Sequence, residues 1–304
     1  MPSPGSKLVI VAALVGNALV GVTKFIAATI TGSSAMMSEG IHSFVDCGNQ
    51  ALLLYGMKRA AKPANEEFPF GHGKEVYFWS FVVAILIFAI GAGVSIYEGI
   101  NHLRHPAELS HVIVNYIVLG VAITFEGVCW VMALREFTRA KGKWSYVEAV
   151  KRGKDPSLFV VLFEDSAALL GLAVALLGVV GGHLFGLVWA DGAASVLIGL
   201  ILAGTSIWLA YETKGLLIGE AASPELVQGI RNLIVESPEV ITVNEVLTMH
   251  MGPDYVLVNL SVSFRDCVTA AELEEAVAQM DARIKLTYPT VKRVFIEGES
   301  WRSD

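Results

Sequence analysis

The sequence predicts a membrane protein in two parts. The first is an all-α bundle of six transmembrane helices over residues 1–214, and the second is a small cytoplasmic α+β domain of ferredoxin-like (αββαβ) order over residues 215–304. The chain is 54% hydrophobic and 17% charged, whereas soluble domains have about 45–50% apolar and about 25% charged residues. The mean hydropathy is +0.58, and the composition becomes that of a soluble domain after Lys214.

Six stretches are long and apolar enough to cross a bilayer, which takes about 20 mostly apolar residues in a helix. The second stretch is the least hydrophobic, because it carries several polar and ionisable residues. We still assign it as a span, because those residues are spaced to share one helix face. The predicted spans are residues 8–30, 34–56, 76–100, 112–134, 157–181 and 190–209.

The distribution of Lys and Arg predicts the orientation of the bundle. The connections after the second and fourth spans are rich in both residues, whereas the connections after the first and fifth have neither and the one after the third has only Arg104. Because cytoplasmic loops carry the excess of basic residues, both termini and the even-numbered connections are expected in the cytoplasm.

The tail has the pattern of a small α+β domain. Apolar residues recur at helical spacing over 224–236, and they alternate as in strands over 240–249 and 255–264. Thr269 and Glu272 form a predicted capping box at the start of a helix that runs to about 286, and residues 291–297 form a last strand. This αββαβ order predicts a half-sheet packed under helices.

Several classes of function are excluded. A net charge of −7 opposes binding to a phosphate backbone, so no nucleic-acid partner is expected. The sequence has no nucleophile–base pair, phosphate loop or HExxH motif, so we expect neither an enzyme nor an organic cofactor. The cysteines are far apart, which excludes a disulfide framework and a thiolate zinc cluster; they are Cys47, Cys129 and Cys267.

Ionisable residues inside a membrane span are costly and therefore indicate function. In the second span, Glu39, His42, Asp46 and Asn49 are spaced to share one face. An imidazole and a carboxylate four residues apart can bind one divalent cation, which makes His42 and Asp46 candidate ligands. Two ligands do not complete a site, and the fifth span offers the adjacent acids Glu164 and Asp165. The alternatives are a polar packing face or a water-filled cavity without metal.

Other polar residues within the spans are expected to serve structure or a proton route rather than metal binding. Asn17 and Lys24 share a face of the first span, and Glu126 lies in the middle of the fourth. A buried pair of Lys24 with an acid would relieve both charges, and either Glu126 or Glu39 fits as the partner.

Four motifs, in this order along the chain, resemble those of the cation diffusion facilitator family of zinc transporters. They are SEGIHSFVD at 38–46, PFGHGKEVYFWS at 69–80, FEDSAALLG at 163–171 and DGAASVLIG at 191–199. The likeness is greatest to the branch of mitochondrial-type zinc transporters and their bacterial relatives. It implies six spans, a homodimer, a cytoplasmic metallochaperone-like dimerisation tail, and exchange of Zn²⁺, the transported substrate, for protons.

The resemblance also implies a transport site with two ligands from the second span and two from the fifth. His42, Asp46 and Asp165 match these positions, but the fourth position falls on Val161, which cannot bind metal. On a helix, Glu164 is turned by roughly 60° from the direction of Val161 and Asp165 by roughly 40° to the other side. We therefore expect Glu164 to be the fourth ligand; the alternative is three protein ligands and a water molecule.

Weaker metal sites are implied elsewhere. Relatives bind a regulatory metal in the connection after the second span, where this chain has Glu67 and His72. The positions that bind zinc in the tails of relatives are Asn244, Asn259, Glu297 and Glu299 here, with His250 nearby. Neutral amides are poor zinc ligands, so a complete binuclear site is not expected and the tail should dimerise mainly through packing.

The function predicted from these features is Zn²⁺ efflux by proton antiport and alternating access. One alternative is export of Mn²⁺, Co²⁺ or Fe²⁺, because three carboxylates and one imidazole suit these ions too. Another is a membrane scaffold that senses metal without transporting it. No Arg/Ser-rich segment precedes the first span, so a bacterial plasma membrane is the expected location.

Overall fold

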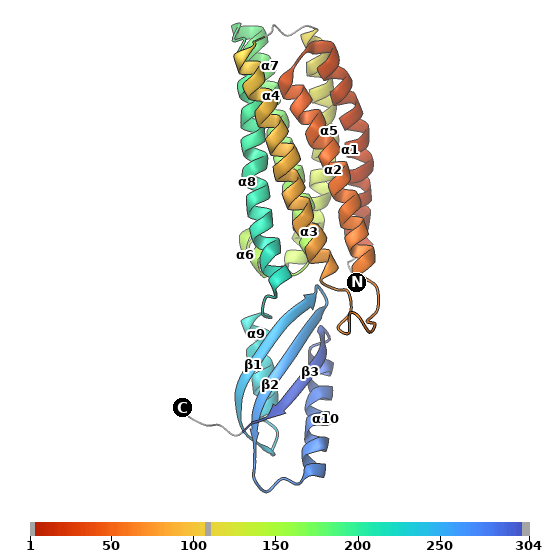
Figure 1. The fold of residues 1–304 in the computed structure, drawn as a ribbon, viewed down its shortest axis with the longest axis vertical. Coiled ribbons are helices and arrows are strands. Elements are labelled where there is room, and N and C mark those ends of the chain that lie inside the picture. The colour runs from red at the N-terminus through yellow and green to blue at the C-terminus, as the bar shows by residue number, and fades with distance from the viewer. Residues whose placement is uncertain (1–3, 107–110, 300–304) are drawn as a thin grey trace. The chain divides into compact units, whose positions relative to one another are not determined.

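The computed structural model describes residues 4–106 and 111–299 (Figure 1). Contacts divide the chain into two units. One contains the described residues up to 59 and from 75 to 214, and the other contains residues 60–74 and those from 215 onward. We describe each unit by itself.

Long helices build the first unit (Figure 1). Five helical segments of the described chain are long and apolar enough to cross a membrane: Ile10–Thr31, Glu75–Arg104, Val112–Lys141, Pro156–Phe185 and Ala190–Ile218. Helix α2 is similarly long but more polar. The helices of this unit are α1 (Pro4–Thr31), α2 (Ser34–Ala60), α3 (Glu75–Leu86), η1 (Ile87–Ala92), α4 (Gly93–Arg104), α5 (Val112–Lys141), α6 (Tyr146–Arg152), α7 (Pro156–Phe185) and α8 (Ala190–Ile218).

The ends of these helices follow from local chemistry. Gly32, with φ of 71°, allows the sharp turn between α1 and α2, since glycine adopts this conformation readily. Helix α7 begins with Pro156 in its first turn and Asp155 as the cap, where the missing N–H of proline costs nothing. Between α3 and α4, a short π-helical segment (η1) interrupts the α-helical hydrogen bonding.

Many polar residues are buried inside this unit, and many large apolar residues are exposed on its outside. Leu177, Leu184 and Ile207 are more than 60% exposed, whereas His42, Asp46 and many other polar residues are buried. This distribution is the reverse of a soluble protein and is expected for helices that face lipid. The buried polar side chains of α2 are Ser34, Ser38, Glu39, His42, Ser43, Asp46, Asn49 and Gln50.

The second unit contains a small α+β domain with the element order αββαβ. It comprises α9 (Pro224–Val235), β1 (Val240–Gly252), β2 (Tyr255–Phe264), α10 (Ala270–Thr287) and β3 (Val291–Gly298). The described strands form one sheet of order β1-β2-β3, in which β2 pairs antiparallel with β1 and parallel with β3. The sheet is thus mixed.

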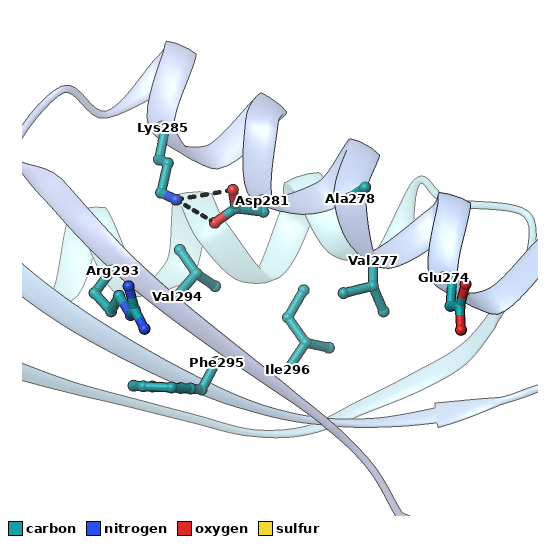
Figure 2. Close-up of a pocket in the computed structure, with 9 residues that line it drawn as sticks. All are labelled: Glu274, Val277, Ala278, Asp281, Lys285, Arg293, Val294, Phe295 and Ile296. Carbon is teal, nitrogen blue, oxygen red and sulfur yellow. Dashed lines mark hydrogen bonds and ion pairs between the residues drawn. The ribbon is translucent and has the colours of Figure 1, made fainter.

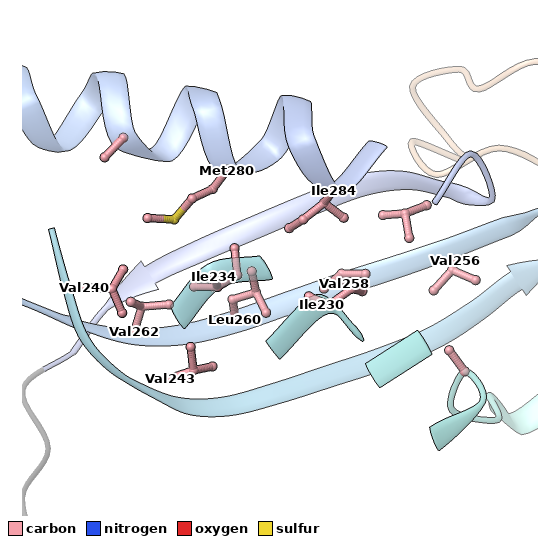
Figure 3. Packing of buried hydrophobic residues seen from close by; sticks show 13 residues of the cluster. Ile230, Ile234, Val240, Val243, Val256, Val258, Leu260, Val262, Met280 and Ile284 are labelled. Carbon is pink, nitrogen blue, oxygen red and sulfur yellow. The ribbon is translucent and has the colours of Figure 1, made fainter. Parts of the chain in front are cut away.

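The core of this domain is apolar and lies between the sheet and its helices (Figure 3). Alternate residues of β2, from Val256 to Val262, point into it and meet Ile230 of α9 and Ile284 of α10. The predicted capping box is confirmed: Thr269 and Glu272 exchange side-chain and backbone hydrogen bonds at the start of α10. These bonds hold the pKa of the Glu272 carboxyl below its usual value, because they favour the charged form.

The connection between α2 and α3 belongs to the second unit. The ring of Phe70 meets that of Phe295 edge to face, with centroids 6.5 Å apart. The Lys74 ammonium lies 3.6 Å from the Met249 sulfur. This loop therefore packs on the sheet of the C-terminal domain.

Candidate metal site in the helix bundle

The candidate ligands of α2 face the same way, as their spacing predicts. His42 and Asp46 are both buried, at 1% and 3% exposed. The His42 Nδ1 atom lies 3.5 Å from Asp46 Oδ1, which is an electrostatic contact rather than a good hydrogen bond. One helical turn thus places a nitrogen donor beside an oxygen donor inside the bundle.

The acids of α7 lie against the polar face of α2. Glu164 and Asp165 are both buried. The Asn49 side chain of α2 donates a hydrogen bond of 3.0 Å to Glu164 Oε1, which joins the two helices directly. Asp46 also interacts electrostatically with Glu164 and Asp165. The structure therefore brings the predicted pairs of the two helices into the same region.

Several nitrogen and oxygen atoms of this region that could bind a metal ion have no hydrogen-bond partner among the residues that the structure describes. A buried polar atom without a partner costs about 1–3 kcal/mol, so these atoms need a proton, a water molecule or a cation. Gln50 lies one turn after Asp46, and both of its polar side-chain atoms also find no hydrogen-bond partner among the described residues. The sequence assigned no role to this residue. The unpartnered ligand atoms are His42 Nδ1 and Nε2, Asp46 Oδ1, Glu164 Oε2 and Asp165 Oδ2.

The four residues do not form a closed ligand sphere in this conformation. Across residues 4–106 and 111–299, no three His, Cys, Asp or Glu side chains are grouped closely enough to hold a metal ion. One oxygen of Glu164 is occupied by Asn49, and Val161 is buried among the same helices. A single site would require the side chains of α2 and α7 to move toward each other.

A second polar cluster surrounds Lys24. Its ammonium donates to Glu39 Oε2 at 3.0 Å, to Ser43 Oγ at 2.9 Å and to Glu126 Oε1 at 2.7 Å. The sequence left open whether Glu39 or Glu126 is the partner, and the structure pairs Lys24 with both. Asn17 is also buried on α1.

Asp191, whose role the sequence analysis missed, fixes the start of α2. Its carboxylate accepts hydrogen bonds from the Ser33 hydroxyl (2.6 Å), from the Ser34 N–H (2.6 Å) and hydroxyl (2.9 Å), and from the Ala35 N–H (3.2 Å). A carboxylate is favourable at a helix N-terminus. The available signal was the acid that opens the DGAASVLIG motif.

The weaker sites predicted elsewhere are placed as follows. His72 Nδ1 lies 3.1 Å from the Pro63 carbonyl oxygen, while Glu67 is exposed. Glu299 Oε2 accepts a hydrogen bond from Ser261, and His250 and Glu297 are on β1 and β3. Within the described ranges none of these residues belongs to a group of three potential ligands, so these sites stay predictions.

The C-terminal domain has a groove of about 430 Å³ between α10 and β3 (Figure 2). Val277, Val294 and Ile296 line it, and Lys285 forms an ion pair with Asp281 at its rim. None of the predicted ligands lines the groove.

A bundle of apolar helices with nitrogen and oxygen donors facing inward is the architecture of a membrane transport protein. Residues 10–218 match the family described as the cation efflux transmembrane domain. The chain therefore belongs to the cation efflux, or cation diffusion facilitator, family, as the motifs indicated. Members of this family are transporters of metal cations and not enzymes.

Similar proteins carry names consistent with this family. The chain is 35% identical to "Proton-coupled zinc antiporter SLC30A9, mitochondrial" of Xenopus laevis over 284 residues, which are 90% of this chain and 49% of that protein. The human protein of the same name is 32% identical over 280 residues, 89% of this chain and 48% of that protein. "Manganese efflux system protein MneP" of Bacillus subtilis is 22% identical over 291 residues, 96% of this chain and 95% of that protein. The chain thus spans about half the length of the first two relatives.

Proposed function

We propose that this chain exports a divalent metal ion, Zn²⁺ in the first place, in exchange for protons. The ligands are His42, Asp46, Glu164 and Asp165. The observation that carries this proposal is the set of buried and unpartnered donor atoms on α2 and α7. Imidazole and carboxylate groups are the ligands that Zn²⁺ accepts in tetrahedral sites.

One of the two carboxylate oxygens of Glu164 is available for metal binding. Its Oε1 atom accepts a hydrogen bond from Asn49, while its Oε2 atom is buried and unpartnered within the described part of the chain. The free oxygen is the one available to a metal ion, and Asn49 then orients the carboxylate. Glu164 thereby replaces the ligand that is missing at Val161.

Proton exchange follows from the chemistry of the same ligands. They bind metal only when the carboxylates are ionised and the imidazole is neutral, so binding releases protons. After the helices rock to open the opposite side, protons compete for the same atoms and the metal ion leaves. This cycle is antiport by alternating access.

The orientation and assembly are part of the proposal. Helix α2 serves as the sixth span, because its polar side chains face the inside of the bundle. The excess of basic residues in the even-numbered connections supports cytoplasmic termini. The transport domain covers 1–214, and the ferredoxin-like, metallochaperone-like domain over 215–304 holds a homodimer together in a bacterial plasma membrane.

The names of the relatives support two candidate substrates. "Proton-coupled zinc antiporter" supports Zn²⁺ and protons, whereas "manganese efflux system protein" supports Mn²⁺. A set of three carboxylates and one imidazole also suits Mn²⁺, Co²⁺ and Fe²⁺, so selectivity has to be measured.

Flux into proteoliposomes that contain only the purified chain tests the proposal. Indicators inside the vesicles report metal and pH while Zn²⁺, Mn²⁺, Co²⁺ or Fe²⁺ is added outside. We expect Zn²⁺ to move in and protons to move out, and both movements to stop in Asp46→Asn. Glu275→Gln, at an exposed residue of α10, is the matched control. Faster Mn²⁺ than Zn²⁺ flux would favour the second substrate, and the absence of any flux would favour a metal-sensing scaffold.

A further inference from the structure

Three charged side chains meet inside the bundle without belonging to the proposed ligand set. Lys24 comes from α1, Glu39 from α2 and Glu126 from α5, and their exposed fractions are 0%, 0% and 5%. With Ser43 they form the cluster around the Lys24 ammonium. We call these three charged residues the lysine triad.

The ammonium of Lys24 has no hydrogen-bonding capacity left. An ammonium has three N–H donors, and Glu39, Ser43 and Glu126 each accept one of them. The second carboxylate oxygens, Glu39 Oε1 and Glu126 Oε2, are buried and find no hydrogen-bond partner in the described ranges. Each carboxylate is thus half satisfied.

The charges of the lysine triad do not cancel when all three groups are ionised. Two carboxylates and one ammonium leave one net negative charge in a buried site. An uncompensated buried charge is strongly unfavourable. One additional positive charge, bound at an unpartnered carboxylate oxygen, removes this excess.

A proton meets this requirement better than a metal ion. The ammonium stands within 3.0 Å of both carboxylates, and its charge repels a second metal cation. A proton binds covalently to one oxygen and converts it into a hydrogen-bond donor. Among the residues that the structure describes, the cluster offers two unpartnered oxygens, Glu39 Oε1 and Glu126 Oε2, fewer than the ligands of a typical zinc or calcium site.

The triad lies in contact with the helix that carries the acids of the metal site. Glu39 Oε1 points at Gly171 of α7, where a Cβ atom would collide with it. The carboxylate of Glu126 acts electrostatically on Asp46 of α2 and Asp165 of α7. His42 and Glu164 are the remaining titratable groups of the ligand set on these helices. A dication bound between α2 and α7 therefore disfavours a proton on the triad, and the coupling is reciprocal.

We propose that Lys24, Glu39 and Glu126 form a proton-binding site, distinct from the metal ligands, which holds one exchangeable proton in the metal-free protein and releases it when the dication binds. The link to the dication rests on the proposed function, whereas the bound proton does not. The triad would thus add one proton to those that the ligands exchange.

The bound proton is tested by infrared spectroscopy of the full chain in lipid nanodiscs, with metal removed by a chelator at neutral pH. The band of protonated carboxyl groups should lose the intensity of one group in Glu39→Gln. Glu126→Gln should give the same loss, because either variant leaves one carboxylate paired with Lys24. If Glu39→Gln does not fold, Glu126→Gln takes its place in the experiment. Lys24→Met should instead add one protonated carboxyl, and Glu275→Gln should change nothing. An unchanged band in both glutamine variants would overturn the proposal.

The link to metal is tested by counting the protons released when Zn²⁺ is added to the full chain in weak buffer. Glu39→Gln should release about one proton fewer per bound Zn²⁺ than the wild type, while Zn²⁺ still binds. An equal number would overturn the coupling. If the wild type binds no Zn²⁺, the proposed function fails, and the infrared result still decides whether the triad carries a proton.

Discussion

Two polar clusters share the buried face of α2, and they differ in the origin of their positive charge. The lysine triad contains its own cation, since the Lys24 ammonium contacts both Glu39 and Glu126. The proposed ligand set consists of His42, Asp46, Glu164 and Asp165, and it includes no Lys or Arg of its own. The Lys24 ammonium cannot leave, so the first cluster always keeps one of its positive charges, whereas in the proposed cycle the second depends entirely on a cation or protons from outside.

If the proposed function holds, this difference allows one helix to combine stability with ion exchange. The triad joins α1, α2 and α5 through hydrogen bonds of 2.7–3.0 Å. The ligand set joins α2 to α7 through one hydrogen bond from Asn49. In the proposed cycle, this less bonded interface between α2 and α7 is the one that opens.

The largest expected effect comes from removing the internal cation. Lys24→Met removes the positive charge that the buried Glu39 and Glu126 carboxyl groups share, and breaking a buried ion pair in this way costs about 3–5 kcal/mol. Thermal unfolding in detergent should show this loss at pH 7.5 and a smaller loss at pH 5, where protons neutralise the carboxylates. Equal losses at the two pH values would contradict the charge argument.

Removing a proposed metal ligand should affect Zn²⁺ binding more than folding. We expect Asp46→Asn to weaken Zn²⁺ binding by more than about 100-fold, which exceeds the roughly 10- to 100-fold cost of losing a group that only orients a ligand. Isothermal titration calorimetry measures the affinity. The melting temperature is the control, because it should fall much less than in Lys24→Met.

The proposed role of Glu164 can be tested by removing its carboxylate and introducing a metal-binding side chain at position 161 instead. Glu164→Gln should weaken Zn²⁺ binding by about 10- to 100-fold, and adding Val161→His should recover most of the loss, because imidazole is a good zinc ligand. Calorimetry on the single and double variants gives the comparison. Unchanged affinity in Glu164→Gln would favour three protein ligands and a water molecule.

The smallest effect is expected outside both clusters. Thr269→Ala removes the cap of α10 and should cost about 1 kcal/mol, which hydrogen exchange of the first turn of α10 can measure. The lowered pKa of Glu272 in the folded state stabilises the helix above the ordinary carboxyl pKa, and this contribution is lost as the pH falls through the folded value. The difference from the wild type should therefore shrink in acid without disappearing, because the bond from the Thr269 hydroxyl to the Glu272 carboxylate weakens on protonation, whereas the bond from the Glu272 N–H to the hydroxyl does not depend on pH. Zn²⁺ binding should not change.

The sequence predicted secondary-structure elements best where the spacing of apolar residues or a helix-capping motif within one short segment determines them. The αββαβ order of the tail and the capping box at Thr269 are confirmed. The shared face of His42 and Asp46 follows from spacing on one helix. Parallel pairing of β2 with β3 and the packing of the loop 60–74 on the C-terminal domain were not predicted, because they depend on contacts between segments distant in sequence.

The sequence by itself determined that the chain has apolar helices with ionisable residues on one face of α2, because hydropathy and helical period are local properties. It also identified the family, since each motif is a short contiguous segment of the chain. Only the tertiary structure decided that Lys24 pairs with both Glu39 and Glu126, that Asn49 holds Glu164, and that Asp191 caps α2. These partners lie on different helices, and helix packing alone determines which polar atoms meet.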